Sequence, residues 1–510
     1  MSLRSHAGAS DAAPATVHAL LAQRAAQSAD AVFAIDASDG SRLSYAALQS
    51  RATAVARACA ALGVAAGDRV AMLLDNRLAT AEVLLGAMAG GFVPVPLNPN
   101  GGAAYLEQVL AHCDATLVVA SAGYLELLEP ARCGAAAPQV LEIDGLLRQD
   151  PGARSGAPGA PQRDHPALLI YTSGTTGQPR GASFSQAQIL ACADNMGRSL
   201  GLDASDRFLC AVPLSHLNGF EKLLSVCWTG GSIVLPGPFR AGEFWELLTR
   251  HRCTWVSLVP TIVRQLLQHA ERHPPPPPAA LAHVRFARSS SAPLPPADHI
   301  AFEARFGLVL AEGMGMTEAG SIFQNPPSRS ARKIGSLGLP CGFEVRLLGA
   351  DGAPVADGEV GEIAVRGASL MTGYYKDPEA TAAARTADGW LRTGDRAHRD
   401  ADGYYFHAGR ATELIIKGGV NIAPAEIDVA VGAHPGVLAA AAVGVPDPYF
   451  GQDVALFVVA RPGAGLSEAT LRAFCEQRLG AFKAPARITF VDDLPRDAAG
   501  KVQRYRLGGA

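Results

Sequence analysis

The sequence predicts an α/β fold: a large N-terminal domain of parallel-rich sheets covered by helices, with a β-subdomain, followed by a small, mobile α+β C-terminal domain. A chain of 510 residues is too long for a single compact core. Strand patterns alternate with helical patterns through the first half, as in parallel sheets. After Arg410 strands and helices interleave over about a hundred residues, the size of a small domain. We therefore expect domains at residues 1–410 and 411–510.

The N-terminal elements follow in the order that a parallel sheet requires. Residues 47–62 (ALQSRATAVARACAAL) have the apolar spacing of a helix, and residues 68–74 read as a buried strand. Residues 81–89 are helical again, and residues 93–96 form a short strand. A Pro/Gly/Ala-rich connection over residues 151–163 then ends this first unit.

The next unit repeats the alternation. An apolar strand at residues 167–171 (ALLIY) runs into a Gly/Thr/Ser loop. The run Pro274–Pro278 is a stiff surface spacer. Three further strands are expected before this proline run, at residues 208–212, 232–235 and 255–258. Three short strands are expected from residue 344 onward, at residues 344–348 (EVRLL), 362–367 (EIAVRG) and 403–409 (GYYFHAG).

Composition narrows the class of protein. The net charge of −3 gives no basic field for nucleic acid or an anionic membrane. Nine cysteines at irregular spacing include no CxxC pair, which disfavours a zinc or disulfide framework and fits reduced thiols in the cytoplasm. No signal peptide is expected at the start, and no run of eighteen apolar residues predicts a membrane span. We expect a cytoplasmic enzyme.

Residues 171–182 (YTSGTTGQPRGA) combine three glycines with hydroxyl side chains directly after a buried strand. Glycines allow close approach of the backbone to an anion, and hydroxyl and N–H groups can surround phosphate oxygens. The segment lacks the GxxxxGK[ST] pattern of a Walker A loop. A flexible surface loop is the alternative to a phosphate site.

This loop resembles the phosphate loop of the ANL superfamily of adenylate-forming enzymes, which includes acyl-CoA synthetases, adenylation domains of peptide synthetases and luciferases. Arg180 stands where the family usually has Lys, which keeps the charge and changes the contact geometry. The resemblance implies that ATP contacts a set of loop residues: Thr172, Ser173, Gly174, Thr175, Thr176, Gly177 and Arg180.

Residues 312–320 (EGMGMTEAG) resemble the family segment that touches adenine, phosphate and metal. By this resemblance Met314 and Gly315 lie at the adenine, Thr317 binds the phosphate and Glu318 holds Mg²⁺. A hard cation bridged to ATP phosphates suits a lone carboxylate. Met314 replaces the usual Tyr, so sulfur packing takes the place of aromatic stacking.

Residues 389–395 (GWLRTGD) resemble the segment whose Asp binds the ribose of ATP. Asp395 takes that role, because a carboxylate can accept a hydrogen bond from each hydroxyl of a vicinal diol. Arg410 would be a second ribose contact. The resemblance places the hinge between the domains two positions later, where Thr412 replaces the usual Asp or Lys.

The C-terminal part carries two more segments of this kind. Gly418 and Gly419 resemble the face that lines the pantetheine tunnel of coenzyme A, where glycines make room for a slim substrate. Residues 495–504 (PRDAAGKVQR) match the PxxxxGKxxR loop, which makes Lys501 the candidate catalytic lysine. By the resemblance, Lys501 serves the first half-reaction and the domain then rotates to admit the thiol.

The resemblance therefore implies an ATP-dependent acyl-CoA synthetase that uses ATP, Mg²⁺ and coenzyme A. A carboxylate attacks the α-phosphorus of ATP, pyrophosphate leaves, and coenzyme A then displaces AMP from the acyl-AMP. Charge on the phosphoryl oxygens calls for preorganised donors and cations. One alternative is an acyl-AMP ligase that loads a separate carrier protein, since no carrier domain follows Lys501. Another is a non-catalytic nucleotide-binding protein.

The acid pocket is expected to draw on residues 213–220, 255–261, 288–294 and 314–320. By the resemblance His216 is a gating or substrate-facing catalytic residue, although a His satisfied inside the fold is the alternative. Arg288, beside three serines, either reads a second carboxylate of the acid or forms a salt bridge at a strand end. The substrate is open between a small polar or dicarboxylic acid and a medium aliphatic acid. The candidate pocket residues are His216, Asn218, Arg288, Ser291 and Met314.

Overall fold

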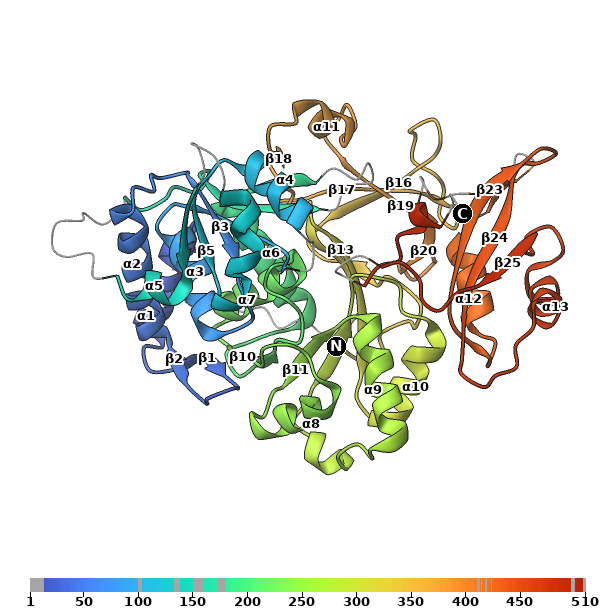
Figure 1. Ribbon diagram of the computed structural model, residues 1–510, viewed down its shortest axis with the longest axis horizontal. Helices are drawn as coiled ribbons and strands as arrows, with labels where there is room; N and C mark the ends of the chain where they lie inside the picture. Colours follow the sequence, from blue (N-terminus) through green and yellow to red (C-terminus); the bar gives the residue numbers. More distant parts are fainter. Residues whose placement is uncertain are drawn as a thin grey trace.

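The structure is a computed structural model that describes residues 13–99, 103–132, 138–149, 159–172, 179–410, 413, 415–417, 420–422, 424–496 and 500–507. Several predicted positions lie outside these ranges, namely Ser173, Gly174, Thr175, Thr176, Gly177, Thr412, Gly418 and Gly419. Within the described ranges, no helix is both long enough and apolar enough to cross a membrane. The elements from residue 415 onward form a separate body at one end of the molecule (Figure 1).

A nine-stranded sheet forms the centre of the molecule. The six neighbouring strands β13, β12, β11, β9, β10 and β1 are parallel to one another. The strands β2 at one edge and β14 and β15 at the other are antiparallel. In spatial order the strands are β15 (Leu339–Pro340), β14 (Gly320–Gln324), β13 (Leu310–Met316), β12 (Phe286–Ser289), β11 (Trp255–Leu258), β9 (Arg207–Leu209), β10 (Ser232–Leu235), β1 (Val32–Asp36) and β2 (Arg42–Ser44).

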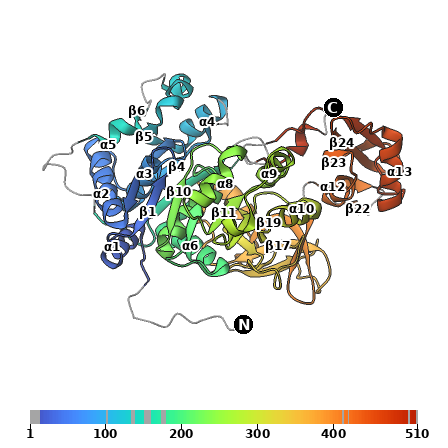
Figure 2. The ribbon, with the colours of Figure 1, turned by 90° about the horizontal axis from the view of Figure 1, so that it is seen from below.

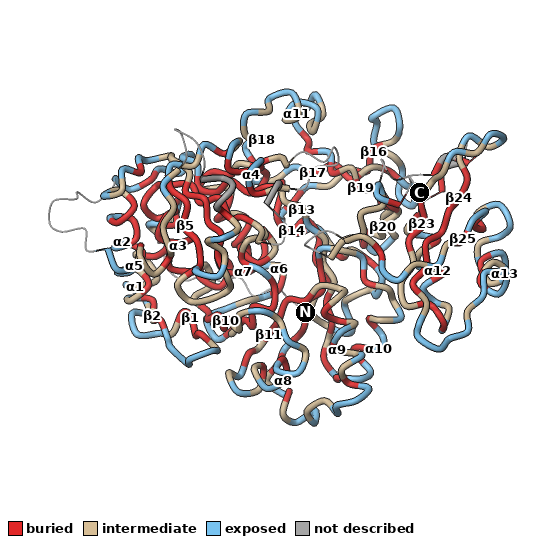
Figure 3. The backbone as a smooth tube through the Cα atoms, viewed as in Figure 1, coloured by how far each residue is buried: buried red, intermediate tan, exposed pale blue. Residues whose placement is uncertain are grey.

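Helices cover both faces of this sheet. Successive side chains of a strand point to opposite faces, so Trp255 packs with the core that holds α6 and α7 while Val256 packs with α8, α9 and α10. Figure 3 shows that much of the backbone of the sheet strands and covering helices belongs to buried residues. The helices are α6 (Gln186–Leu200), α7 (Leu217–Thr229), α8 (Ala241–Arg250), α9 (Pro260–Arg272) and α10 (Pro296–Phe306).

A second, fully parallel sheet holds the N-terminal units and has the strand order β4-β3-β5-β6. Val70 packs toward α2 and α3, and Ala71 packs toward α4, again by alternation. The elements are α1 (Val17–Gln27), α2 (Tyr45–Ala61), β3 (Arg69–Leu73), α3 (Leu78–Ala89), β4 (Val93–Pro96), α4 (Ala103–Cys113), β5 (Ala115–Ala120), β6 (Gln139–Glu142) and α5 (Ile143–Leu147).

Two antiparallel sheets complete the N-terminal part. The first joins β7 and β8, which flank the predicted phosphate loop, to β18; the second, the β-subdomain, has the order β16-β17-β19-β20. The elements are β7 (Pro166–Thr172), β8 (Arg180–Ser185), β16 (Glu344–Leu348), β17 (Gly361–Arg366), β18 (Gly373–Tyr374), α11 (Pro378–Ala383), β19 (Leu391–Arg399) and β20 (Tyr405–Arg410).

The C-terminal body is a sheet with its own two cores, one on each face. In β24, Val454 and Leu456 pack against α12 and α13, and Ala455 and Phe457 pack against Leu494 on the opposite face. Both views of the ribbon show this body apart from the central sheet (Figures 1 and 2). Its elements are β21 (Ile415–Lys417), β22 (Val420–Ile422), α12 (Pro424–Gly432), β23 (Val437–Asp447), β24 (Gly451–Ala460), α13 (Glu468–Leu479) and β25 (Arg487–Phe490).

The predicted α/β class is confirmed, and so are most elements. The strands expected at residues 93–96, 232–235 and 255–258 have those bounds. The strand expected at 208–212 is wrong in its second half, because β9 ends at Leu209. Beyond it the Asn76 side chain donates to the Val212 carbonyl at 2.8 Å and accepts from the Leu214 N–H at 2.9 Å, which replaces sheet pairing with side-chain contacts.

Candidate active site

A cavity of about 170 Å³ lies where several strands of the central sheet end. Because neighbouring parallel strands meet with their carboxyl ends at one edge, residues at the ends of β12 and β13 converge there with the first turn of α7, and Ile170 and Tyr171 of β7 complete the lining. We call this hollow the acid cavity. Among the predicted residues it is lined by His216, Asn218, Arg288, Ser291, Gly315 and Thr317.

Met316, and not Met314, belongs to the wall of the acid cavity. A bulge between Met314 and Gly315 breaks the register of β13 with β14, and a bulge re-aims side chains. Gly315 is required at this point, because a Cβ atom there would lie 2.4 Å from the Gly320 carbonyl oxygen. The placement of Met314 at adenine stays a prediction.

Arg288 is 1% exposed and points into a group of hydroxyl and amide side chains. Its guanidinium donates to Gln324 Oε1 at 2.6 Å, Ser290 Oγ at 2.5 Å and Ser321 Oγ at 3.2 Å. Burial lowers the pKa of Arg288, and the negative charge of Glu221 opposes that effect. No carboxylate forms an ion pair with Arg288 among the residues that the structure describes, so the strand-end salt bridge is not observed there.

Two charged residues of α7 contribute to this region, and the sequence reasoning missed both. Glu221 is 2% exposed and accepts from the Ser321 N–H at 2.9 Å and from Ser321 Oγ at 2.8 Å. Lys222 is fully buried behind Asn218. A Glu–Lys pair inside an otherwise apolar helical segment was the signal that could have found them, since such residues are almost never buried unless paired.

A second group of charges lies on the β-subdomain, and we call it the ribose cluster: Asp395, His407 and Arg410. Asp395 faces Arg410 across the β19–β20 pair. Its Oδ1 accepts from Arg410 Nε at 3.1 Å and lies 3.2 Å from His407 Nε2. Burial raises the pKa of Asp395, but the hydrogen bond from His407 and the charges of Arg410 and Lys501 outweigh it, so the net pKa is lowered.

Glu318 connects the ribose cluster to the base of the phosphate loop. It is 8% exposed, and its Oε1 accepts from the Tyr374 hydroxyl at 2.8 Å. The guanidinium of Arg180 lies 5.7 Å from the centre of the Tyr374 ring, a cation–π geometry. Burial raises the pKa of Glu318, and Tyr374 and Arg410 act against that rise. Thr172, at the end of β7, lies within 3.5 Å of the Arg180 carbonyl oxygen.

The segment at residues 495–504, of which the structure describes 495–496 and 500–504, is called the Lys501 loop. It reaches from the C-terminal body to the N-terminal part. A Cβ atom at Gly500 would lie 3.3 Å from Thr261 in the first turn of α9. The positive charge of Lys501 acts on Asp395. Arg504 anchors the segment through Glu413 at 3.2 Å and the Ala442 carbonyl at 2.8 Å. Lys501 is thereby brought to the ribose cluster from a remote part of the sequence.

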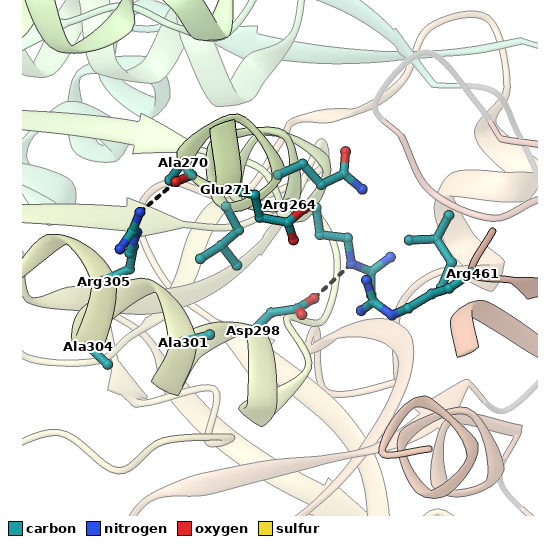
Figure 4. Close-up of a pocket in the computed structure, with 11 residues that line it drawn as sticks. Arg264, Ala270, Glu271, Asp298, Ala301, Ala304, Arg305 and Arg461 are labelled. Carbon is teal, nitrogen blue, oxygen red and sulfur yellow. Dashed lines mark hydrogen bonds and ion pairs between the residues drawn. The ribbon is translucent and has the colours of Figure 1, made fainter. Parts of the chain in front are cut away.

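A larger hollow of about 720 Å³ lies between α9, α10 and the C-terminal body (Figure 4). Its charges are largely occupied: Arg264 pairs with Asp298 at 2.7 Å, and Arg305 donates to the Ala270 carbonyl at 2.5 Å. None of the predicted site residues lines it. Its size therefore does not make it the active site.

The described residues include no group of three or more His, Cys, Asp or Glu side chains placed to hold a metal ion. Mg²⁺ is commonly held by one or two carboxylates together with substrate phosphates. The single buried carboxylate of Glu318 fits that mode and does not fit a metal site built from protein ligands alone.

Comparison with known proteins identifies the family. Residues 21–375 match the model of the AMP-binding enzyme family, and residues 426–501 match that of the AMP-binding enzyme C-terminal domain. A sulfoacetate–CoA ligase of Cupriavidus necator is 46% identical, over 96% of this chain and 97% of that protein. An oxalate–CoA ligase of Arabidopsis thaliana is 33% identical, over 88% and 90%.

The fold agrees with these relatives. The crystal structure of ATP-bound MatB from Rhodopseudomonas palustris superposes with a TM-score of 0.90 at 30% identity, over 97% of this chain and 98% of that one. The chain belongs to the AMP-binding enzyme family. Within it, the chain is an AMP-forming acid–CoA ligase that uses ATP and coenzyme A and proceeds through an acyl-AMP. The predicted resemblance and activity are confirmed.

Proposed function

We propose that the acid substrate is a short carboxylic acid with a second anionic group, and that sulfoacetate is the first compound to test. The observation that carries this is the buried Arg288 in the wall of a cavity of only about 170 Å³. A guanidinium fork matches a planar or tetrahedral oxyanion, and the alkyl end of an aliphatic acid offers no such group. The relatives that act on sulfoacetate and oxalate support the same choice.

The lining residues of the acid cavity suggest how the substrate lies. Thr317 marks the side toward Glu318 and the nucleotide, so the reacting carboxylate points there. Arg288 and Ser291 line the same cavity, and in this proposal they hold the second anion. The small volume disfavours a medium aliphatic acid, since a longer chain would displace buried side chains. His216, at the start of α7, also lines the cavity and faces the substrate in this proposal.

The ribose cluster and the Lys501 loop serve ATP in this proposal. Asp395 accepts hydrogen bonds from the ribose hydroxyls, and its lowered pKa keeps it ionised for that purpose. Arg410 holds the Asp395 carboxylate in position. Lys501 stabilises the charge that develops between the acid and the α-phosphate. Arg180, Gly315 and Thr317 complete the phosphate and adenine contacts with the loop at residues 172–177, and Met314 packs near adenine.

Glu318 holds Mg²⁺ in this proposal, with the nucleotide phosphates as the other ligands. The metal would neutralise phosphate charge when bound. Tyr374 contributes by donating to the carboxylate and keeping it oriented. A proton on Glu318 would compete with the metal, so the balance between burial and the Tyr374 hydrogen bond sets the pH at which the site works.

The chain divides at residue 410 in this proposal, and the part from 411 rotates about residue 412. The Lys501 loop against α9 corresponds to the first half-reaction. The second brings Gly418 and Gly419 to coenzyme A. Coenzyme A, and not a carrier protein, is the acceptor that the relatives' names support. A cytoplasmic location is supported by the eight cysteines of the described residues, which are all free thiols.

A pyrophosphate-release screen tests this proposal. Purified enzyme, ATP, Mg²⁺ and coenzyme A are combined with sulfoacetate, oxalate, malonate, propionate, hexanoate and ferulate, and kcat/KM is measured for each. We expect the short dianionic acids to exceed propionate and hexanoate. A preference for propionate or a longer monocarboxylic acid would overturn the proposed substrate class and leave the ligase activity itself intact.

A further inference from the structure

Lys222 is an ammonium group without any solvent contact, one helical turn behind the acid cavity. It is 0% exposed, and it donates a hydrogen bond to Asn218 Oδ1. Its Nζ lies 3.7 Å from Glu221 Oε2. Placing such a charge in the interior is costly unless it is paired or has a function.

Lys222 determines which end of the Asn218 amide faces the acid cavity. A lysine ammonium has three donors and no acceptor, so the amide oxygen must face it. Ser290 Oγ, which accepts from Arg288, also donates to the same oxygen at 3.3 Å. Two chains of donors thus converge on Asn218 Oδ1.

The amide nitrogen of Asn218 is consequently turned the other way. It donates to Ser291 Oγ at 3.0 Å. Ser291 follows β12 with φ of +75°, a left-handed conformation that is uncommon for a residue other than glycine. Such strained positions cluster at functional sites. The wall formed by Asn218 and Ser291 therefore presents donors to the cavity.

The buried charges around Lys222 are more positive than negative. Arg288 on β12 and Lys222 on α7 are two buried cations, and Glu221 on α7 is the one buried carboxylate that the described part of the chain places beside them. The Cys210 thiol, after β9, is the other titratable group that acts on Lys222. With Lys222 protonated, the group carries one unbalanced positive charge next to the cavity. A substrate with one charged group at the distal end would balance it.

We propose that Lys222 is a specificity-determining positioning residue: it orients Asn218 as a donor and supplies the second positive charge that selects an acid with a distal anion. This role rests on the proposed substrate class. It concerns a residue that does not line the cavity and acts only through Asn218 and through its charge.

The titration of Lys222 makes the role visible in the pH profile. Burial and the charge of Arg288 lower its pKa to about 7, against the effect of Glu221. Only the protonated form of Lys222 attracts an anion and fixes the orientation of the Asn218 amide. The KM for sulfoacetate should therefore be low below pH 7 and rise above it, by up to about tenfold per pH unit. Sulfonate and carboxylate are both ionised throughout this range, so the acid itself does not change charge.

The test compares sulfoacetate with propionate, which carries a methyl group in place of the sulfonate. Lys222→Met should lower kcat/KM for sulfoacetate by about ten- to a hundredfold, mainly through KM. Propionate and the KM for ATP should be unchanged, and the pH dependence of the sulfoacetate KM should disappear. Lys333→Met is the matched control, since Lys333 pairs with Asp400 and Asp402 at the surface at 2.5 Å each.

The outcomes separate the two proposals. If the wild type prefers sulfoacetate and Lys222→Met keeps that preference, the role of Lys222 is overturned alone. An equal loss with both acids assigns Lys222 to stability and also overturns the role. If the wild type prefers propionate, the substrate class and the role of Lys222 fall together. Should Lys222→Met not fold, the wild-type pH profile decides: a KM ratio of sulfoacetate to propionate that stays flat from pH 6 to 8.5 overturns the proposal.

Discussion

The acid cavity and the ribose cluster lie in the same active-site region and have opposite electrostatic organisation. In the ribose cluster the buried carboxylate of Asp395 is matched by Arg410 and His407, and its pKa is lowered. At the acid cavity the buried Arg288 lines the wall and the buried Lys222 lies behind it, with Glu221 as the one buried carboxylate that the described residues place beside them, and the pKa of each cation is lowered. The first arrangement pairs its buried carboxylate with cations, whereas the second has one more buried cation than carboxylate among the described residues. Under the proposed function, this difference fits a ribose cluster that binds ATP and an acid cavity that selects the acid.

The largest change in this difference between the two regions is expected when Arg288, the cation in the wall of the acid cavity, is removed. Arg288→Met should lower kcat/KM for sulfoacetate by about 2–5 kcal/mol in transition-state binding, the usual cost of truncating one partner of a buried charge pair. Propionate should be spared, since it has no distal anion. Arg264→Met is the control, because Arg264 pairs with Asp298 in the larger hollow. Equal losses with both acids would make Arg288 structural.

The next prediction concerns the cation that the C-terminal body adds to the ribose cluster. Lys501→Ala should slow adenylation by about 10²–10³, the range for removal of one charge-stabilising donor. Thioester formation from presynthesised acyl-AMP should be nearly unchanged, as measured by single-turnover assay. Arg506→Ala removes an exposed cation five residues further on and should affect neither step. Equal slowing of both half-reactions would contradict domain rotation.

Asp395→Ala tests whether the ribose cluster provides uniform binding. We expect the KM for ATP to rise about ten- to a hundredfold, since hydrogen bonds to a charged acceptor contribute ~1.5–3 kcal/mol. The KM for the acid should change little. Selectivity for ATP over 2′-deoxy-ATP should fall as well. Asp388→Ala, which removes an exposed carboxylate paired with Arg346 at 2.8 Å, is the control. Unchanged discrimination between the two nucleotides would place the ribose elsewhere.

The smallest effect is expected at Tyr374, which donates to Glu318 between the ribose cluster and the base of the phosphate loop. Tyr374→Phe removes the hydrogen bond that lowers the pKa of Glu318, so this pKa should rise further. If ionised Glu318 is needed, the fall of the adenylation rate at low pH should begin at a higher pH than in the wild type. In that low-pH range the variant should lose about 0.5–1.5 kcal/mol of transition-state stabilisation. Tyr375→Phe is the control, since its hydroxyl lies 3.2 Å from Asp114 instead. An unshifted profile would remove Glu318 from the metal site.

The two regions also differ in how far the sequence revealed them. Asp395, Arg410 and Lys501 lie in short local segments whose residue order was readable. The position of Arg288 beside three serines was readable too. Lys222 and Glu221 were missed, because a Lys and a Glu on a helix are usually exposed, and only the packing of α7 against α6, β10 and β14 buries them.

The sequence by itself determined the α/β class, the order of most strands and helices, the family and the activity. These follow from local periodicity and from contiguous segments, both of which are written along the chain. Only the tertiary structure decided that Arg288 has hydroxyl and amide partners, that Met316 replaces Met314 in the cavity wall, and that Lys222 orients Asn218. Burial, register and the pairing of charges depend on residues far apart in sequence, so no local pattern specifies them.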